Sequence, residues 1–148
     1  MQHVLTVGLL AMCILLSWGC NKKAIVDEAR RPEDGVYRGV FIDGDSIQIN
    51  VEIILKDGVV AEASFRHLHR DNDYHLAAEE EPYRSVVQQY QEALDHLIGK
   101  NLAAHLGDLY APETIVSTIV DGYTAATLRS NKIISAIRDA MNRGVYSY

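Results

Sequence analysis

Residues 46–55, SIQINVEIIL, alternate apolar and polar side chains almost without a break, and this run constrains the fold more than any other feature of the chain. Successive side chains of a β-strand point to opposite faces, so the run predicts a strand with one buried and one solvent-facing side. The buried side would hold Ile47, Ile49, Val51, Ile53 and Leu55, and the wet side Ser46, Gln48, Asn50 and Glu52. On this interpretation Ile49→Asp unfolds the domain by burying an unpaired carboxylate, whereas Gln48→Asp is nearly neutral.

Turn signals flank this run on both sides. The segment DGVYRGVFIDGD at 34–45 is rich in β-branched and aromatic residues between Asp-Gly pairs, which predicts a strand that runs into a turn. Asp57 and Gly58 supply a hairpin turn, after which VVAEASF at 59–65 returns as a further strand. We therefore expect three antiparallel strands with one wet face.

Helical periodicity follows the strands. Apolar residues recur at spacings of three and four between Pro82 and Gly99, which predicts a helix there; they are Val86, Val87, Tyr90, Leu94, Leu97 and Ile98. A second stripe, closed by Gly144, predicts the last helix; it consists of Ile133, Ile134, Ile137, Ala140 and Met141. Strands followed by helices indicate an α+β fold, a small antiparallel sheet of hairpins packed with helices.

Two segments between these helices are less distinctive. Leu102 and Leu106 extend the first helical region by a short piece, and ETIVSTIV at 113–120 fits either a strand or an extended lead-in. The chain has 148 residues, of which 48% are apolar, so it is long enough for one ordinary cored domain. Its net charge of −6 argues against a nucleic-acid partner, whose groove needs clustered Lys and Arg.

The first 20 residues differ in composition from everything that follows. The run from Val4 to Trp18 carries no charge and falls short of the roughly 20 residues that span a bilayer as a helix, which is typical of a secretory signal. The segment LLSWGCN resembles the lipobox of bacterial lipoproteins, in which a small residue, here Gly19, precedes a cysteine that becomes acylated. An ordinary signal peptide that ends near a cysteine is the alternative.

Cysteine usage agrees with acylation at Cys20. The second cysteine, Cys13, would leave with the signal, so the exported protein would hold Cys20 alone and no internal disulfide. We expect residues 1–20 to be a signal peptide, 21–33 a polar tether and 34–148 the folded domain. The protein would be exported and lipid-anchored to a bacterial membrane, facing the periplasm or the cell exterior.

Histidines gather at the end of the third predicted strand. A His-x-His pair, His67 and His69, would point both imidazoles to one side of a strand, and His75 follows shortly after. No further ligand completes a metal site at useful spacing, and Asp71 and Asp73 do not continue into a calcium loop. The sequence therefore favours polar histidines at a strand end, and no metal is expected.

The segment DGYTAATLRS at 121–130 places hydroxyl groups and small side chains where the last helix begins. Unpaired N–H groups and the helix dipole attract phosphate to such an end, and small residues let a ligand approach the backbone closely. The simpler alternative is that Ser130 or Thr127 only caps the helix.

The order of residues in this segment resembles the flavinylation motif of the FMN-binding domain family, Asp-x-x-Ser/Thr-Gly-Ala-Thr. Asp121, Thr124, Ala126 and Thr127 match, and Leu128 and Ser130 match the usual continuation. The family includes the C subunit of the sodium-pumping NADH:quinone reductase and the G subunit of Rnf-type complexes. The opening hairpins and the helix after the motif are also similar, so the resemblance covers roughly residues 34–141, and 34–148 is identified as an FMN-binding domain.

The resemblance implies a membrane-anchored electron-transfer flavoprotein rather than a stand-alone catalyst. A flavin transferase would join FMN covalently to Thr127, Asp121 would help to position the modification site, and Thr124, Ala125, Ala126 and Leu128 would line the cofactor. Envelope or membrane redox proteins would be its electron-transport partners. Two residues depart from the family pattern: Ala125 replaces the usual glycine, and Arg129 replaces the usual threonine.

Two other functions stay open at this point. One is an envelope binding or assembly module on the same fold without bound flavin, suggested by Ala125. The other is a metal-binding lipoprotein that uses His67, His69 and His75, suggested by their spacing alone.

The lipobox-like segment leads to a direct test. We expect the protein expressed in a bacterium to partition with membranes, because an acylated Cys20 would tether it, and Cys20→Ser to release or mislocalise it. Fractionation and immunoblotting measure this. Equal membrane association of the two proteins would exclude the anchor.

Overall fold

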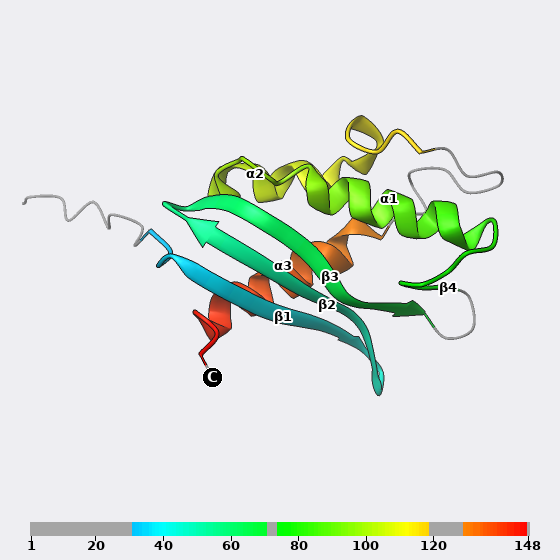
Figure 1. Ribbon diagram of the computed structural model, residues 1–148, viewed down its shortest axis with the longest axis horizontal. Coiled ribbons are helices and arrows are strands. Elements are labelled where there is room, and N and C mark those ends of the chain that lie inside the picture. Colours follow the sequence, from blue (N-terminus) through cyan, green and yellow to red (C-terminus); the bar gives the residue numbers. More distant parts are fainter. Residues whose placement is uncertain (1–30, 71–73, 119–128, 148) are drawn as a thin grey trace, which may run out of the picture.

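The computed structural model describes residues 31–70, 74–118 and 129–147. The predicted signal segment with Cys20, the predicted tether as far as residue 30, and residues 121–128 of the threonine motif lie outside the described residues. Within the described ranges, no helix is both long and apolar enough to cross a membrane. The described residues form an antiparallel sheet with helices packed on it (Figure 1), as expected for an α+β fold.

The sheet has three long strands and one short one, β1 (Gly35–Asp43), β2 (Ser46–Lys56), β3 (Val59–Arg70) and β4 (Tyr74–His75). They pair antiparallel in sequence order. Asp57 and Gly58 both have positive φ, at 53° and 75°, as a two-residue hairpin turn of type I′ requires. The predicted three-stranded sheet is therefore confirmed. β3 runs five residues beyond the expected end at Phe65, and β4 was not predicted.

The helices begin where the apolar spacing predicted them. They are α1 (Tyr83–Asp95), α2 (Leu102–His105), the short 3-10 helices η1 (Leu106–Tyr110) and η2 (Pro112–Thr114), and α3 (Ser130–Arg143). However, α1 ends at Asp95, before the predicted end at Gly99, and Ile98 of the predicted stripe lies beyond the helix and is exposed. Pro82 is the N-cap of α1, and Gly144 ends α3 with a φ of 81°. The strand alternative for 113–120 is wrong over its described part, because Pro112–Thr114 forms a 3-10 helix and no strand follows up to residue 118.

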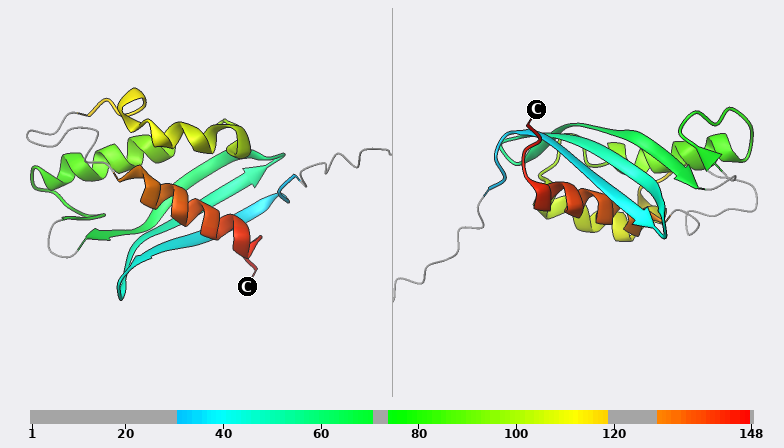
Figure 2. Two further views of the ribbon diagram at one scale, coloured as in Figure 1. Left: turned by 180° about the vertical axis from the view of Figure 1, so that it is seen from behind. Right: turned by 90° about the horizontal axis from the view of Figure 1, so that it is seen from below.

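The core lies between the sheet and the two long helices. α3 crosses the face of the sheet against β1 and β2, and α1 packs along β3 (Figure 2). Ile49, Val51, Ile53 and Leu55 are fully buried, which confirms the predicted inner face; the side chain of Ile47 lies outside the described part. The helical stripes complete this core with Val86, Tyr90, Leu94, Leu97, Ile133, Ile134, Ile137 and Ala140.

Gln48 departs from the predicted alternation. Phe41 pairs with Ile49 and Ile42 pairs with Ile47, so Gln48 is an extra residue without a partner across β1. Such a β-bulge interrupts the alternation of side chains, and Gln48 is only 8% exposed, beside the buried Ile49. Its assignment to the wet face is wrong, and the expected neutrality of Gln48→Asp no longer follows.

The opposite face of the sheet is polar, as predicted. Glu52 on β2 accepts hydrogen bonds from Arg38 on β1 (2.6 Å) and from Arg66 on β3 (3.0 Å). The hydrogen bond from Arg38 holds the pKa of the Glu52 carboxyl below its ordinary value against partial desolvation, and Arg66 adds to the effect. This carboxylate therefore links all three long strands on the face opposite α1 and α3.

The outer edge of β1 is covered by α3 and by the chain that follows it. The Val40 N–H donates to Asp139 Oδ2 on α3 (2.8 Å), and the Tyr146 N–H donates to the Val36 carbonyl (2.7 Å). The Arg38 guanidinium lies 3.9 Å from the centre of the Tyr146 ring. These contacts satisfy part of an edge that would otherwise be open to pairing with another chain.

Gly39 sets the distance between α3 and the sheet. A Cβ at this position would lie 2.1 Å from the Ala136 carbonyl oxygen and 2.3 Å from the Ala140 nitrogen, both of them backbone atoms of α3. Real side chains do not approach backbone this closely, so any larger residue would push the helix off β1.

We expect Gly39→Ala to lower the free energy of unfolding by about 3 kcal/mol through this overpacking. Gly107→Ala is the matched control, because a Cβ there meets no atom within 4 Å, and its effect should stay within about 0.5 kcal/mol. Chemical denaturation followed by circular dichroism measures both. Equal stability of the Gly39 variant and the wild type would contradict the close approach of α3 to β1.

Candidate functional site

The threonine motif at 121–128 is the candidate site, and the structure describes the residues on either side of it. Ser117 and Thr118, here called the entry stem, precede the motif; Arg129 and Ser130, the exit stem, follow it. Asp121, Thr124, Ala125, Ala126, Thr127 and Leu128 themselves lie outside the described residues. The geometry of the site is therefore the geometry of its two stems.

The entry stem is bound to α1 through one carboxylate. Glu92 Oε2 accepts hydrogen bonds from the Ser117 N–H (2.7 Å) and the Thr118 N–H (3.0 Å), and Glu92 Oε1 accepts one from the Thr118 hydroxyl. Desolvation opposes ionisation of Glu92, but the hydrogen bonds from Thr118 and Ser117 outweigh it, so the pKa of this carboxyl lies below its ordinary value. An ionised Glu92 thus fixes the backbone just before the motif.

A second side chain of α1 binds the same stem. Gln89 Nε2 donates to the Thr118 carbonyl oxygen at 2.8 Å. Thr118 is therefore held at its N–H, its hydroxyl and its carbonyl by two residues one helical turn apart, Gln89 and Glu92.

The exit stem is fixed by a buried hydroxyl. Ser130 is 3% exposed, and its Oγ donates to the Leu109 carbonyl of η1 at 2.5 Å. The N-cap of α3 is Arg129, and no side chain caps this end. Ser130 therefore does not act as the predicted cap: its hydroxyl points to η1 instead, while Thr127, the other predicted cap, lies outside the described part.

The first turn of α3 holds a buried cation. Lys132 is 8% exposed, and its Nζ donates to Gln48 Oε1 on the β2 bulge and lies 3.3 Å from Asp43 Oδ2. The Phe41 ring is 5.2 Å away. The first turn contains no acidic residue, although the helix dipole favours acids there and disfavours cations. The β-bulge turns the Gln48 side chain inward, and Gln48 Oε1 is thus the hydrogen-bond acceptor for Lys132, a cation at the unfavourable end of the helix dipole.

Sequence reasoning missed four of these polar residues: Gln48, Gln89, Glu92 and Lys132. One signal was available for Lys132, because a lysine in the first turn of a helix runs against the dipole. Gln89 and Glu92 look like the solvated side of an amphipathic helix, and only the tertiary structure brings them to Thr118.

The predicted histidine cluster is only partly assembled. His67 and His69 lie on β3, with ring centres 5.8 Å apart, and His75 on β4 pairs with His69 on β3. Among the residues that the structure describes, no group of three or more His, Cys, Asp or Glu side chains is arranged to hold a metal ion. The metal-binding hypothesis gains no support from these side chains.

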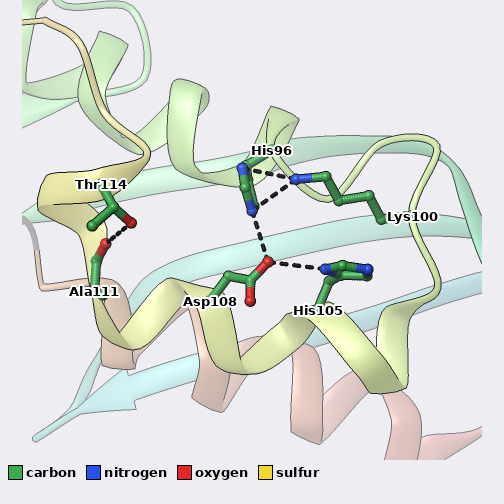
Figure 3. A network of polar contacts seen from close by, with 6 residues as sticks. All are labelled: His96, Lys100, His105, Asp108, Ala111 and Thr114. Atoms are coloured by element: carbon green, nitrogen blue, oxygen red, sulfur yellow. Dashed lines mark hydrogen bonds and ion pairs between the residues drawn. The ribbon is translucent and has the colours of Figure 1, made fainter.

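A second polar cluster, not predicted, joins the end of α1 to α2 and η1 (Figure 3). Asp108 Oδ2 lies 2.9 Å from His96 Nε2 and 3.0 Å from His105 Nδ1, and Lys100 Nζ lies 2.8 Å from His96 Nε2. The hydrogen bonds from His96, and then from His105, lower the pKa of the Asp108 carboxyl. Asp108 immediately precedes Leu109, so this cluster supports the segment that holds the exit stem.

Comparisons with known proteins return no relative: no family model matches the chain, and neither a characterised protein nor a solved structure matches it. The resemblance to the FMN-binding domain family therefore depends on the motif residues and on the order of hairpins and helices around them.

The role of the Glu92 carboxylate in holding the entry stem can be tested by substitution. We expect Glu92→Gln to lower the free energy of unfolding by about 1 to 3 kcal/mol, because two backbone N–H groups lose a charged acceptor. The folded pKa of Glu92 is depressed, so its stabilisation is complete above the ordinary value of 4.5 and is lost as the pH falls through the lower folded pKa. The gap between wild type and variant should thus be constant near neutrality and shrink in acid.

Asp95→Asn is the control for this variant, since Asp95 is an exposed carboxylate of the same helix that binds only Gln91 among the described contacts. Its effect should stay within about 0.5 kcal/mol. Urea denaturation across a pH series measures all three proteins. A gap that widens in acid would contradict the assignment of an ionised Glu92 to the stem.

Proposed function

We propose that this protein is an exported, lipid-anchored electron-transfer flavoprotein that carries FMN esterified to Thr127. The observation that carries the proposal is the threonine motif, Asp121, Thr124, Ala126 and Thr127, set immediately before α3. Thr127 precedes the first residue of α3, Ser130, by three positions.

The charge at the start of α3 supports a phosphate there. The positive end of the helix dipole, the adjacent Arg129 and the buried Lys132 share this end, and its first turn contains no acid. Asp43, the carboxylate nearest to Lys132, is largely exposed, so it neutralises the lysine only weakly. A phosphate ester at Thr127 would supply the anion that this helix end lacks.

The two stems support a modification site of fixed position. Both ends of the segment are attached to the folded body by side chains, with Glu92 and Gln89 at the entry and Ser130 at the exit. Attachment at both ends reduces the conformational entropy that a motif loses when a cofactor orders it. Such a site suits a transferase that must reach one particular hydroxyl.

The residues that would hold FMN are Asp121, Thr124, Ala125, Ala126, Thr127 and Leu128. When bound, the isoalloxazine ring would supply the redox chemistry, and the surrounding chain would set its potential and exposure. A flavin transferase is then the maturation partner, and membrane or envelope redox proteins are the electron donor and acceptor.

A second candidate function is an envelope binding or assembly module on the same fold without bound flavin. Ala125 favours it, because the FMN-binding domain family has glycine at this position and a Cβ would obstruct a backbone that needs positive φ or close contact with the phosphate.

Co-expression with a flavin transferase tests the first candidate. We expect denaturing electrophoresis under ultraviolet light to give a fluorescent band for the wild type and for Thr124→Ser, and no band for Thr127→Ala. Dithionite should bleach the flavin absorbance of the native wild type, and air should restore it.

Two other outcomes would decide against the proposal as stated. A colourless wild-type protein after co-expression would exclude the electron carrier. Flavin that appears only in Ala125→Gly would show that this substitution had disabled the site, which supports the second candidate.

A further inference from the structure

A cavity of about 330 Å³ lies where the end of α3 and the chain after it meet β1 and β2 (Figure 1). Its lining includes Arg38 on β1, Asn50 on β2, Arg143 at the end of α3, and Tyr146 and Ser147 after the helix. None of the described residues that line it is acidic, although the chain has a net charge of −6. The cavity is therefore a basic site on an acidic protein.

Arg143 is held at this cavity by Asp139, which lies one helical turn before it. Asp139 Oδ2 accepts hydrogen bonds from Arg143 Nε (2.8 Å) and from the Val40 N–H of β1 (2.8 Å). Val40 is the partner of Asn50 in the pairing of β1 with β2. One carboxylate thus holds the Arg143 guanidinium beside this strand pair. It uses only Nε, and the terminal nitrogens of Arg143 bind no other described residue.

Arg38 is fixed by two contacts of its own. Its Nε donates to Glu52 at 2.6 Å, and its guanidinium lies 3.9 Å from the centre of the Tyr146 ring. A side chain that is already restricted in this way loses less conformational entropy when it binds a ligand. The cavity thus holds two guanidinium groups whose positions are set before a ligand arrives.

Asn50 adds a carboxamide that has no partner. Its side chain makes no hydrogen bond with any described residue, and its Oδ1 is buried. An unsatisfied buried acceptor is unfavourable for folding, so the fold itself gains nothing from an amide at this position. The Nδ2 donor is not buried, and it is available to a molecule in the cavity.

A phosphate group fits these donors. Arginine binds phosphate through charge-assisted, often bidentate hydrogen bonds. A phosphate ester has three strong acceptor oxygens, enough for donors from β1, β2 and the end of α3, whereas a carboxylate has only two. Arg143 also offsets the negative end of the α3 dipole, which would otherwise repel an anion here.

We propose that this cavity binds a phosphate group, which accepts hydrogen bonds from the guanidinium groups of Arg38 and Arg143 and from Asn50 Nδ2. The inference does not depend on the proposed function, because the cavity lies at the C-terminal end of α3 and the threonine motif precedes its first residue.

The phosphate could belong to a small soluble compound or to a lipid head group. The lipid is a candidate because Gly144 and Val145 also line a neighbouring cavity together with Arg31, where the described chain begins after the predicted tether. The two sources share one chemistry, and the experiment below distinguishes them.

Titration followed by nuclear magnetic resonance tests the site in the full chain, labelled with nitrogen-15 and kept in non-ionic detergent micelles. The probes are inorganic phosphate at constant ionic strength and, separately, phosphatidylglycerol added to the micelles. Two signals are followed: the Asn50 carboxamide, identified by its loss in Asn50→Leu, and the Ser147 backbone N–H. We expect both to shift and saturate, and the dissociation constant to rise at least about tenfold in Arg143→Gln, which loses charge-assisted hydrogen bonds. Saturation by phosphate supports a soluble ligand, and saturation by the lipid alone supports a head group.

Arg138→Gln is the matched control, because Arg138 is an exposed arginine of the same helix that does not line the cavity. Its dissociation constant should stay within about twofold of the wild type, since salt screens exposed charges outside the site. Asn50→Leu should bind phosphate more weakly at Ser147 yet melt no lower than the wild type, because it loses no hydrogen bond within the protein.

Three results would overturn the inference. One is the absence of saturable shifts with either probe. Another is an equal loss of affinity in Arg138→Gln and Arg143→Gln, which would reflect net charge alone. The third is equal affinity for acetate, which would exclude recognition of phosphate.

Discussion

The close approach of α3 to β1 at Gly39 is the constraint on which the rest of the structure depends. Without a side chain at this position, the helix backbone lies directly on the strand, so the start of α3 is fixed relative to the end of the first hairpin. There Lys132 reaches the β2 bulge at Gln48, and Ser130 reaches the Leu109 carbonyl. A larger residue at Gly39 would displace both contacts together with the helix. The position of the exit stem thus depends on a glycine far from it in sequence.

Much of this fold could be predicted because its signals are local. The alternation from Ile49 to Leu55, the Asp57-Gly58 turn and the apolar stripe of α3 each lie within a dozen residues and require no knowledge of a partner element. The bulge at Gln48 could not be found in this way. It is defined by a mismatch of register between two strands, and an uninterrupted alternating pattern gives no sign of it. The same limit applies to β4, which has only two residues.

The motif could be found in the sequence, but its supports could not. Glu92 and Gln89 lie 25 to 29 residues before the backbone that they hold, and Lys132 lies 84 residues after its acceptor Gln48. In the sequence these are ordinary polar residues of amphipathic helices. Hydrogen bonds between such distant groups depend on how the helices pack, which local patterns do not determine. Ser130 shows the converse. A serine at a helix start suggests an N-cap, but here its hydroxyl donates a hydrogen bond to the Leu109 carbonyl of η1 instead.

Two polar irregularities flank the candidate site, and they differ in kind. At the entry stem a buried acceptor, Gln89 Oε1, has no donor. At the exit stem a buried cation, Lys132, occupies the positive end of a helix with only an exposed carboxylate nearby. Either one alone would be a modest cost that folding can absorb. They lie on the two helices that hold the stems, Gln89 on α1 and Lys132 on α3, so each long helix carries one buried polar group whose partners are incomplete. The polar side chains that hold the stems thus carry a cost that the apolar core must offset, and that core depends on the close packing of α3 at Gly39.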